Sequence, residues 1–241
     1  MKKIGLVGGI SWSSTIDYYR IINEETNRLN GGLHFAECMI YSVNFHRFHA
    51  CNAAHDWDGS FALLLDAALQ LEKAGAELIL LCANTAHIVA ERVAEKMHSP
   101  LIDIRVVTAA AVAQKNLKKV GLLGTTYTME LDFYRQKLQE NGIETMIPAS
   151  KAERDFIEFT LLHELGKGIL SAQTKKVYLR IAETLIERGA EGIILGCTEI
   201  PLLISQEDFS IPVFNTTEIH ARAAVAYAIS SFTNQTTDYV L

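Results

Sequence analysis

The sequence has no cluster of lysine and arginine residues. It carries 22 Lys and Arg against 28 Asp and Glu, so its formal net charge is -6 at pH 7. Binding to the phosphates of nucleic acid needs a concentrated cationic surface. The sequence therefore predicts no nucleic-acid partner.

Long apolar runs are also absent. The first one, after Met1–Lys3, is interrupted at Gly8 and Gly9, too early for a signal-peptide core or a membrane span. We therefore expect no membrane partner and a cytoplasmic location.

The four cysteines show no C-x-x-C spacing, so a zinc site or a redox dithiol has little support. We expect free thiols in a reducing compartment. The segment Phe45–His49 carries two histidines, but no acid or cysteine there completes a ligand set. We predict no metal, and a loop lining the active-site cleft at this segment.

The composition is that of a folded protein, with 49% hydrophobic and 21% charged residues,. A chain of 241 residues can form one large domain or two domains of about 100 to 120 residues. An internal repeat favours two. Three segments recur in the same order: Lys2–Gly8 as Lys118–Gly124, Leu71–Cys82 as Leu185–Cys197, and Pro100–Asp103 as Pro212–Asn215.

Short Val/Ile/Leu runs such as Leu78–Leu81 alternate with helical stretches such as Ala83–Lys96, a pattern typical of buried parallel strands joined by helices. We predict an α/β fold of two pseudo-symmetric domains, 1–104 and 105–216, each a parallel sheet flanked by helices. Ligands of such sheets bind beyond the carboxyl ends of the strands. If the two halves face each other, the active site lies in the cleft between the domains.

Cys82 and Cys197 each follow a predicted strand at equivalent places in the repeat. After Cys82, Asn84 or Thr85 can cap a helix, and a helix N-terminus lowers a thiol pKa from about 8.5 toward neutrality. Two equivalent thiols suit racemisation, in which one removes the α-proton and the other returns a proton to the opposite face. The alternative is that these cysteines are inert core residues.

The carbanion formed beside a carboxylate needs hydrogen-bond donors around that carboxylate. The candidates, which follow three predicted strands, are Asn84, Thr85, Thr125, Thr126 and Thr198. His87 and Glu199 could each tune the neighbouring thiol, although His87 equally fits an exposed position on a helix.

The segment Gly8–Thr15 matches neither the dinucleotide-binding pattern nor a Walker loop,. We interpret it as a turn whose backbone and hydroxyl groups approach a small anionic ligand, with Trp12 as a wall.

Four motifs resemble the aspartate/glutamate racemase family: G-G-I-S-W-S-S-T at Gly8, C-A-N-T-A-H at Cys82, G-T-T-Y-T-M at Gly124 and G-C-T-E-I-P-L-L at Gly196. The resemblance runs from Lys3 to about Ile229. It implies racemisation of a small amino-acid substrate without pyridoxal phosphate, metal or other cofactor, and often a homodimer. It also implies that a C-terminal helix, at 217–241, returns to complete the first domain.

The resemblance implies that Cys82 and Cys197 are the catalytic acid/base pair. Together with the motifs, it gives these predicted substrate contacts: Gly9, Trp12, Thr15, Asn84, Thr85, Thr125, Thr126, Thr128, Lys167, Thr198 and Glu199. Lys167 could provide a cation for an acidic side chain, or it is a solvated loop lysine.

Two segments depart from the aspartate-specific members of the family. Ser11–Ser13 replaces their proline-containing stretch, and Ser42–His46 replaces a P-D-R loop whose arginine grips the side-chain carboxylate. These departures resemble the broad-specificity branch.

Two other functions stay open on the sequence alone. A decarboxylase or a cis/trans isomerase of a dicarboxylic acid would use a related fold, but a second cysteine disfavours the single-cysteine decarboxylase. A non-catalytic solute-binding protein also has two α/β lobes, and the missing export signal counts against it.

Overall fold

The computed structural model describes residues 1–230. Within this range the chain forms two compact units. Unit 1 comprises Met1–Val107 together with the described chain from Thr217 onward, and unit 2 comprises Thr108–Thr216. The part of the predicted C-terminal helix at 231–241 lies outside the described residues.

Unit 1 contains a four-stranded parallel sheet with the strand order β2-β1-β3-β4. Its strands are β1 (Ile4–Gly8), β2 (Cys38–Ser42), β3 (Leu78–Leu81) and β4 (Leu101–Ile102). Its helices are α1 (Trp12–Asn30), α2 (Phe45–Ala53), α3 (Trp57–Lys73), the 3₁₀ helix η1 (Thr85–Val89), α4 (Ala90–Ala94) and α10 (Thr216–Ser230). Helix α5 (Ile104–Gln114) begins in unit 1 and continues into unit 2.

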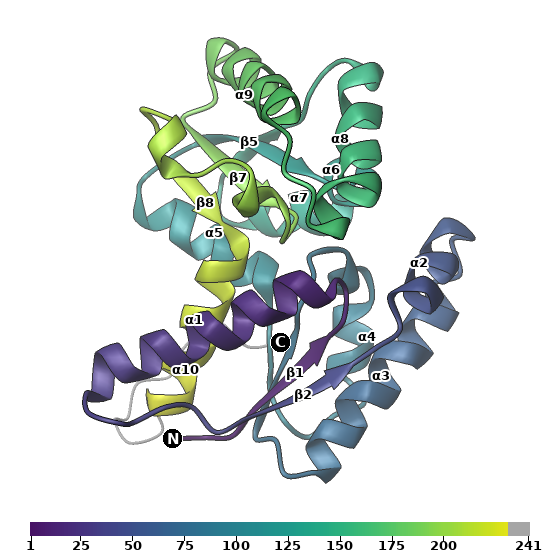
Figure 1. Ribbon diagram of the computed structural model, residues 1–241, viewed down its shortest axis with the longest axis vertical. Helices are drawn as coiled ribbons and strands as arrows, with labels where there is room; N and C mark the ends of the chain where they lie inside the picture. Colours follow the sequence, from purple (N-terminus) through teal and green to yellow (C-terminus); the bar gives the residue numbers. More distant parts are fainter. Residues whose placement is uncertain (231–241) are drawn as a thin grey trace. The chain divides into compact units, whose positions relative to one another are not determined.

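Alternate residues of the central strands of unit 1 face opposite sides, as the period of a strand requires. Ile4 and Leu80 belong to one hydrophobic cluster with residues of α1 and α10. Val7 and Leu81 belong to another cluster with residues of α3 and η1. Both faces of the sheet are therefore covered by helices (Figure 1), which explains why β3 is apolar at every position.

Unit 2 repeats this topology, with a parallel sheet in the order β6-β5-β7-β8. Its strands are β5 (Lys119–Gly124), β6 (Glu144–Met146), β7 (Gly192–Gly196) and β8 (Val213–Asn215). Its helices are α6 (Thr126–Glu130), α7 (Asp132–Glu140), α8 (Lys151–His163), η2 (Leu165–Lys167), α9 (Ala172–Glu187), η3 (Ile200–Leu202) and η4 (Gln206–Asp208).

Two equivalent glycines show why the repeated sequence segments pack alike. A Cβ on Gly5 of β1 would meet the side chain of Ile79 on β3, and a Cβ on Gly121 of β5 would meet that of Ile193 on β7. At both places a helix packs closely on the sheet: Leu71 of α3 also contacts the first position, and Leu185 of α9 the second. The predicted α/β fold with two parallel sheets is confirmed.

The interpretation of Phe45–His49 as a loop is wrong, because this segment begins helix α2. The side chain of Asn44 caps the helix by accepting a hydrogen bond from the backbone N–H of His46 at 2.9 Å, and this cap favours a helix here. In the described range 1–230 no group of three or more His, Cys, Asp or Glu side chains is placed to hold a metal ion. No helix in that range is long and apolar enough to cross a membrane.

Candidate active site

The predicted site residues of unit 1 lie at the carboxyl ends of β1 and β3. These strands are neighbours, and the backbone N–H of Cys82 donates to the carbonyl oxygen of Val7 at 3.0 Å. The turn after β1, which contains Gly9, therefore lies beside the segment that begins at Cys82. This is the arrangement expected where parallel strands end at one edge of a sheet.

The turn after β1 is held by its own side chains. Gly9 has a φ of +83°, and its N–H donates to the hydroxyl of Thr15 at 2.9 Å. That hydroxyl in turn donates to the carbonyl oxygen of Ser11 at 2.7 Å. Thr15 thus stabilises the turn through both contacts, whereas Trp12, at the start of α1, is exposed.

Cys82 is fully buried, and its thiol lies 3.9 Å from the carbonyl oxygen of Leu80. Burial raises the pKa of Cys82, because a thiolate is poorly solvated there. The lower pKa predicted from a helix N-terminus is therefore wrong. The chain after Asn84 forms the short 3₁₀ helix η1 followed by five-residue α4, and the Asn84 side chain makes no cap hydrogen bond.

His87 is fully buried, so an exposed position for it is wrong. Its Nε2 accepts a hydrogen bond from the N–H of Ile104 at 3.2 Å, and its Nδ1 lies 2.9 Å from the carbonyl oxygen of Ala83. Nδ1 must therefore carry the proton and donate it to that oxygen. Both ring nitrogens are engaged with the backbone, so His87 ties the residue after Cys82 to the start of α5.

A second buried histidine packs against the first, with ring centroids 5.7 Å apart. Nε2 of His220 donates to the carbonyl oxygen of Ile102 at 2.8 Å, and Tyr18 donates its hydroxyl proton to Nδ1 at 2.8 Å. Burial lowers the pKa of His220 to about 3, and it also lowers the pKa of His87. Both rings are therefore neutral at pH 7.

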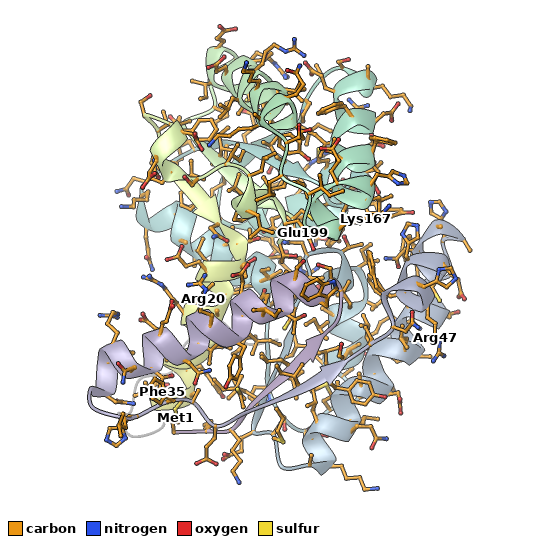
Figure 2. The ribbon with its side chains drawn as sticks, viewed as in Figure 1. Met1, Arg20, Phe35, Arg47, Lys167 and Glu199 are labelled. Carbon is orange, nitrogen blue, oxygen red and sulfur yellow. The ribbon has the colours of Figure 1, made fainter. Side chains whose placement is uncertain are left out.

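The predicted site residues of unit 2 have the equivalent placement in their own sheet, at the ends of β5 and β7, where Gly124 pairs with Gly196. Cys197 follows β7 directly and is half-buried. Its thiol donates to Oε2 of Glu199 at 2.9 Å, and the hydroxyl of Thr198 donates to the same oxygen at 3.1 Å. Glu199 is buried, at 6% exposure, and is labelled in Figure 2.

The pKa of Cys197 is raised well above its ordinary value, first by burial and then by the charge and hydrogen bond of Glu199. Like Cys82, it is a thiol rather than a thiolate at neutral pH. The two cysteines differ in their surroundings, since the thiol of Cys82 contacts a backbone carbonyl where that of Cys197 contacts a carboxylate.

The predicted threonine contacts of unit 2 gather around α6. Thr125 caps this helix by accepting from the N–H of Thr128 at 3.2 Å, and the two hydroxyls lie 3.1 Å apart. The N–H of Thr126 donates to Oε2 of Glu158 at 2.7 Å. The backbone N–H of Thr126 is therefore already bonded to a carboxylate of the protein.

Glu158, on α8, is a residue that the sequence analysis missed. Its charge also raises the pKa of Cys197, so two carboxylates act on this thiol. Nothing in the spacing of α8 distinguishes Glu158 from a surface glutamate, and only the tertiary contact with Thr126 reveals it. Lys167, by contrast, is exposed at the end of η2, and in Figure 2 it lies toward the same end of unit 2 as Glu199.

The structure thus brings the predicted residues together in two groups, one at the strand ends of each unit. In unit 1, Gly9, Thr15 and Asn84 lie at the same strand ends as Cys82. In unit 2, Thr125 follows β5, and Glu199 contacts Cys197 after β7. Such strand-end sites define a ligand-binding α/β protein. Comparison with known proteins identifies which kind.

The family model described as Asp/Glu/Hydantoin racemase matches residues 7–224. A crystal structure of a candidate Asp/Glu racemase from Yersinia pestis is similar with a TM-score of 0.87 and 45% identity, covering 95% of this chain and 100% of that one. An aspartate racemase homologue from Pyrococcus horikoshii OT3 has a TM-score of 0.82 and 38% identity, over 95% and 99% of the two chains. The broad specificity amino-acid racemase RacX of Bacillus subtilis is 25% identical over 226 residues, 92% of this chain and 96% of RacX.

The chain belongs to the Asp/Glu/Hydantoin racemase family. It is an isomerase, in agreement with the enzyme class predicted from its motifs.

Proposed function

We propose that the protein is a cofactor-independent amino-acid racemase in which Cys82 and Cys197 exchange a proton with opposite faces of one substrate α-carbon. The observation that carries the proposal is the duplicated placement of a cysteine directly after the second central strand of each sheet, after β3 in unit 1 and after β7 in unit 2. Membership of the racemase family supports it. A reaction that looks the same from either enantiomer calls for two equivalent bases.

Both cysteines are thiols at neutral pH, so the one that acts as base must first give its proton to water, while the other stays a thiol. The thiolate takes the α-proton, and the electron pair of the broken C–H bond moves into the carboxylate to give a planar enolate. The second thiol then donates its proton to the opposite face, which leaves the product enantiomer and a new thiolate. The two cysteines have exchanged roles, and the reverse reaction or proton exchange with water restores them.

We propose that Cys197 is the acid in the resting enzyme. Its thiol already donates to Glu199, and the negative carboxylate opposes formation of a thiolate beside it. The same hydrogen bond gives the thiol proton a place to go when Cys197 acts as base. The thiol of Cys82 instead faces the carbonyl oxygen of Leu80, at 3.9 Å.

For the substrate we propose several amino acids rather than aspartate alone. Ser11–Ser13 and Ser42–His46 depart from the aspartate-specific pattern, and the relative RacX is named for broad specificity. Exposed Lys167 is the cation we propose for acidic side chains. The homodimer stays a prediction that sedimentation of the purified chain would check.

The test is solvent exchange at the α-carbon. The purified protein, with no cofactor added, is incubated with a mixture of L-amino acids in D₂O, and NMR follows the α-proton signals while optical rotation follows racemisation. We expect both the α-proton signal and the optical rotation to be lost for more than one amino acid. A double variant Cys82→Ser/Cys197→Ser is the control and should show neither. Absence of exchange with every amino acid, while both thiols stay reduced, would contradict the proposal and favour a dicarboxylate isomerase or a binding protein.

A further inference from the structure

A depression in unit 2 beside the edge strand β6 concentrates positive charge. It has a volume of about 680 Å³, and its charged lining residues are Lys119, Arg135, Arg154, Arg188 and Glu144. The lining therefore holds four cationic side chains and one carboxylate, in a chain whose net charge is -6. We propose that this depression is a binding site for a small anion that carries a phosphate group.

Two of the guanidinium groups are held in place by consecutive backbone carbonyls after β6. Nη1 of Arg154 donates to the carbonyl oxygens of Pro148 at 2.8 Å and Ala149 at 2.9 Å, and Nη1 of Arg188 donates to that of Ile147 at 3.3 Å. A guanidinium has five N–H donors, so these bonds position each group and leave further donors for a ligand. Such preorganisation lowers the entropy lost on binding.

The third guanidinium is incompletely satisfied. Nε of Arg135 is buried without a hydrogen-bond partner among the described residues, and so is the hydroxyl of Thr145 on β6, which also lines the depression. Buried polar groups without partners are costly. The Arg135 side chain is 41% exposed, so it can turn to bring its donors to an anion.

The carboxylates around the depression do not neutralise it. Lys119 pairs with Glu144 at 3.0 Å, and Arg154 pairs with Glu130 at 2.6 Å. Arg135 lies 3.7 Å from Asp132, a long pair, and Arg188 has no carboxylate partner within the described chain. The charge of Arg188, and that of Arg135 with its long and exposed pair, are what an anion would complement,.

The lining favours a phosphate group over a carboxylate. Three guanidiniums and an ammonium approach the depression from different elements. A tetrahedral phosphate with three terminal oxygens can accept hydrogen bonds from several directions, whereas a planar carboxylate accepts them mainly in its own plane, as in a bidentate pair with one guanidinium. None of the ten residues that line the depression, all of them described, is aromatic. The site therefore offers no ring on which a nucleotide base could stack.

The depression is separate from the candidate catalytic thiol of its unit. Met146, which lines it, pairs with Gly121 of β5, whereas Cys197 follows Gly196, which pairs with Gly124. Three residues of strand separate the two levels, about 10 Å. Occupation of the depression therefore does not require the proposed racemase site.

The experiment is calorimetric titration of the full chain with pyrophosphate at low ionic strength, repeated with the variants Arg135→Gln and Arg188→Gln. The matched control is Arg180→Gln, which removes the same charge from an exposed position on α9 outside the depression. We expect one saturable site per chain, weakened about tenfold or more by either pocket variant and unchanged by the control. Binding should persist in Cys197→Ser, whatever that variant does to racemisation.

Three results would overturn the proposal: no saturable binding of pyrophosphate, equal loss in Arg180→Gln and the pocket variants, or binding of citrate at least as tight as that of pyrophosphate. Thermal melting of each variant checks that it is folded before its binding is compared. Should one pocket variant fail to fold, the other still decides between these outcomes.

Discussion

Replacement of Glu199 by glutamine is predicted to lower the pKa of Cys197. In the wild-type chain the carboxylate accepts the thiol proton at 2.9 Å and is 6% exposed. Ionising the thiol would place two negative charges beside each other, which is why Glu199 adds to burial in raising this pKa. Glutamine keeps a carbonyl oxygen as acceptor and removes the charge.

The size of the change follows from Coulomb's law. Two unit charges about 4 Å apart at an effective dielectric constant of about 20 interact with about 4 kcal/mol. One pKa unit corresponds to about 1.4 kcal/mol, so removing this charge should lower the pKa of Cys197 by about three units. Burial of the thiol stays, and the charge of Glu158 stays with it.

The assay is alkylation of Cys197 by iodoacetamide across a series of pH values, quantified by mass spectrometry of the peptide that contains it. The midpoint should move to lower pH in Glu199→Gln. The control Glu207→Gln removes a charge from an exposed position in the same unit and should leave the midpoint where it is. An unchanged or higher midpoint in Glu199→Gln would refute the assignment of Glu199 to this thiol.

Two further predictions concern the buried histidines. The variant His87→Asn keeps a donor for the carbonyl of Ala83, whereas His87→Gln keeps an acceptor for the N–H of Ile104. Because the bond to Ala83 fixes the residue after Cys82, kcat should fall further in His87→Gln than in His87→Asn. Equal kcat values would argue against a role for that bond. Because burial lowers the folded-state pKa values of His87 and His220, the unfolded chain binds more protons below pH 6.5. The free energy of unfolding should therefore be greatest above about pH 6.5 and should fall as the pH drops toward 3, by up to about 1.4 kcal/mol per pH unit from His220, with His87 acting in the same direction,. Urea denaturation at several pH values checks this, and a flat profile between pH 6.5 and 4 would contradict it.

The sequence predicted those features that local pattern determines. Apolar runs such as Leu78–Leu81 became buried strands, because a strand covered on both faces must be apolar throughout. The internal repeat predicted two similar sheets, and equivalent glycines at Gly5 and Gly121 show the shared packing that preserves it. Strand ends then brought glycine turns and cysteines together within each unit.

The sequence could not predict features that depend on tertiary burial. The helix expected after Cys82 is a 3₁₀ helix followed by a single short α-helix, so the expected electrostatic lowering of the thiol pKa gives way to desolvation. The sequence does not distinguish an exposed position for His87 from a role beside Cys82. Only its contacts with the backbone of Ala83 and of Ile104 show that it is buried and bonded on both ring nitrogens. Glu158 reaches the backbone of Thr126 from another helix, a contact that no spacing indicates.

The most direct test of the two-cysteine proposal is racemisation by the single variants Cys82→Ser and Cys197→Ser, each assayed from both enantiomers of a substrate found by solvent exchange. A serine hydroxyl is a far weaker acid than a thiol, so each variant should lose about 10²- to 10⁴-fold in kcat in both directions while remaining folded. Full activity in either single variant would remove that cysteine from the reaction and contradict the account.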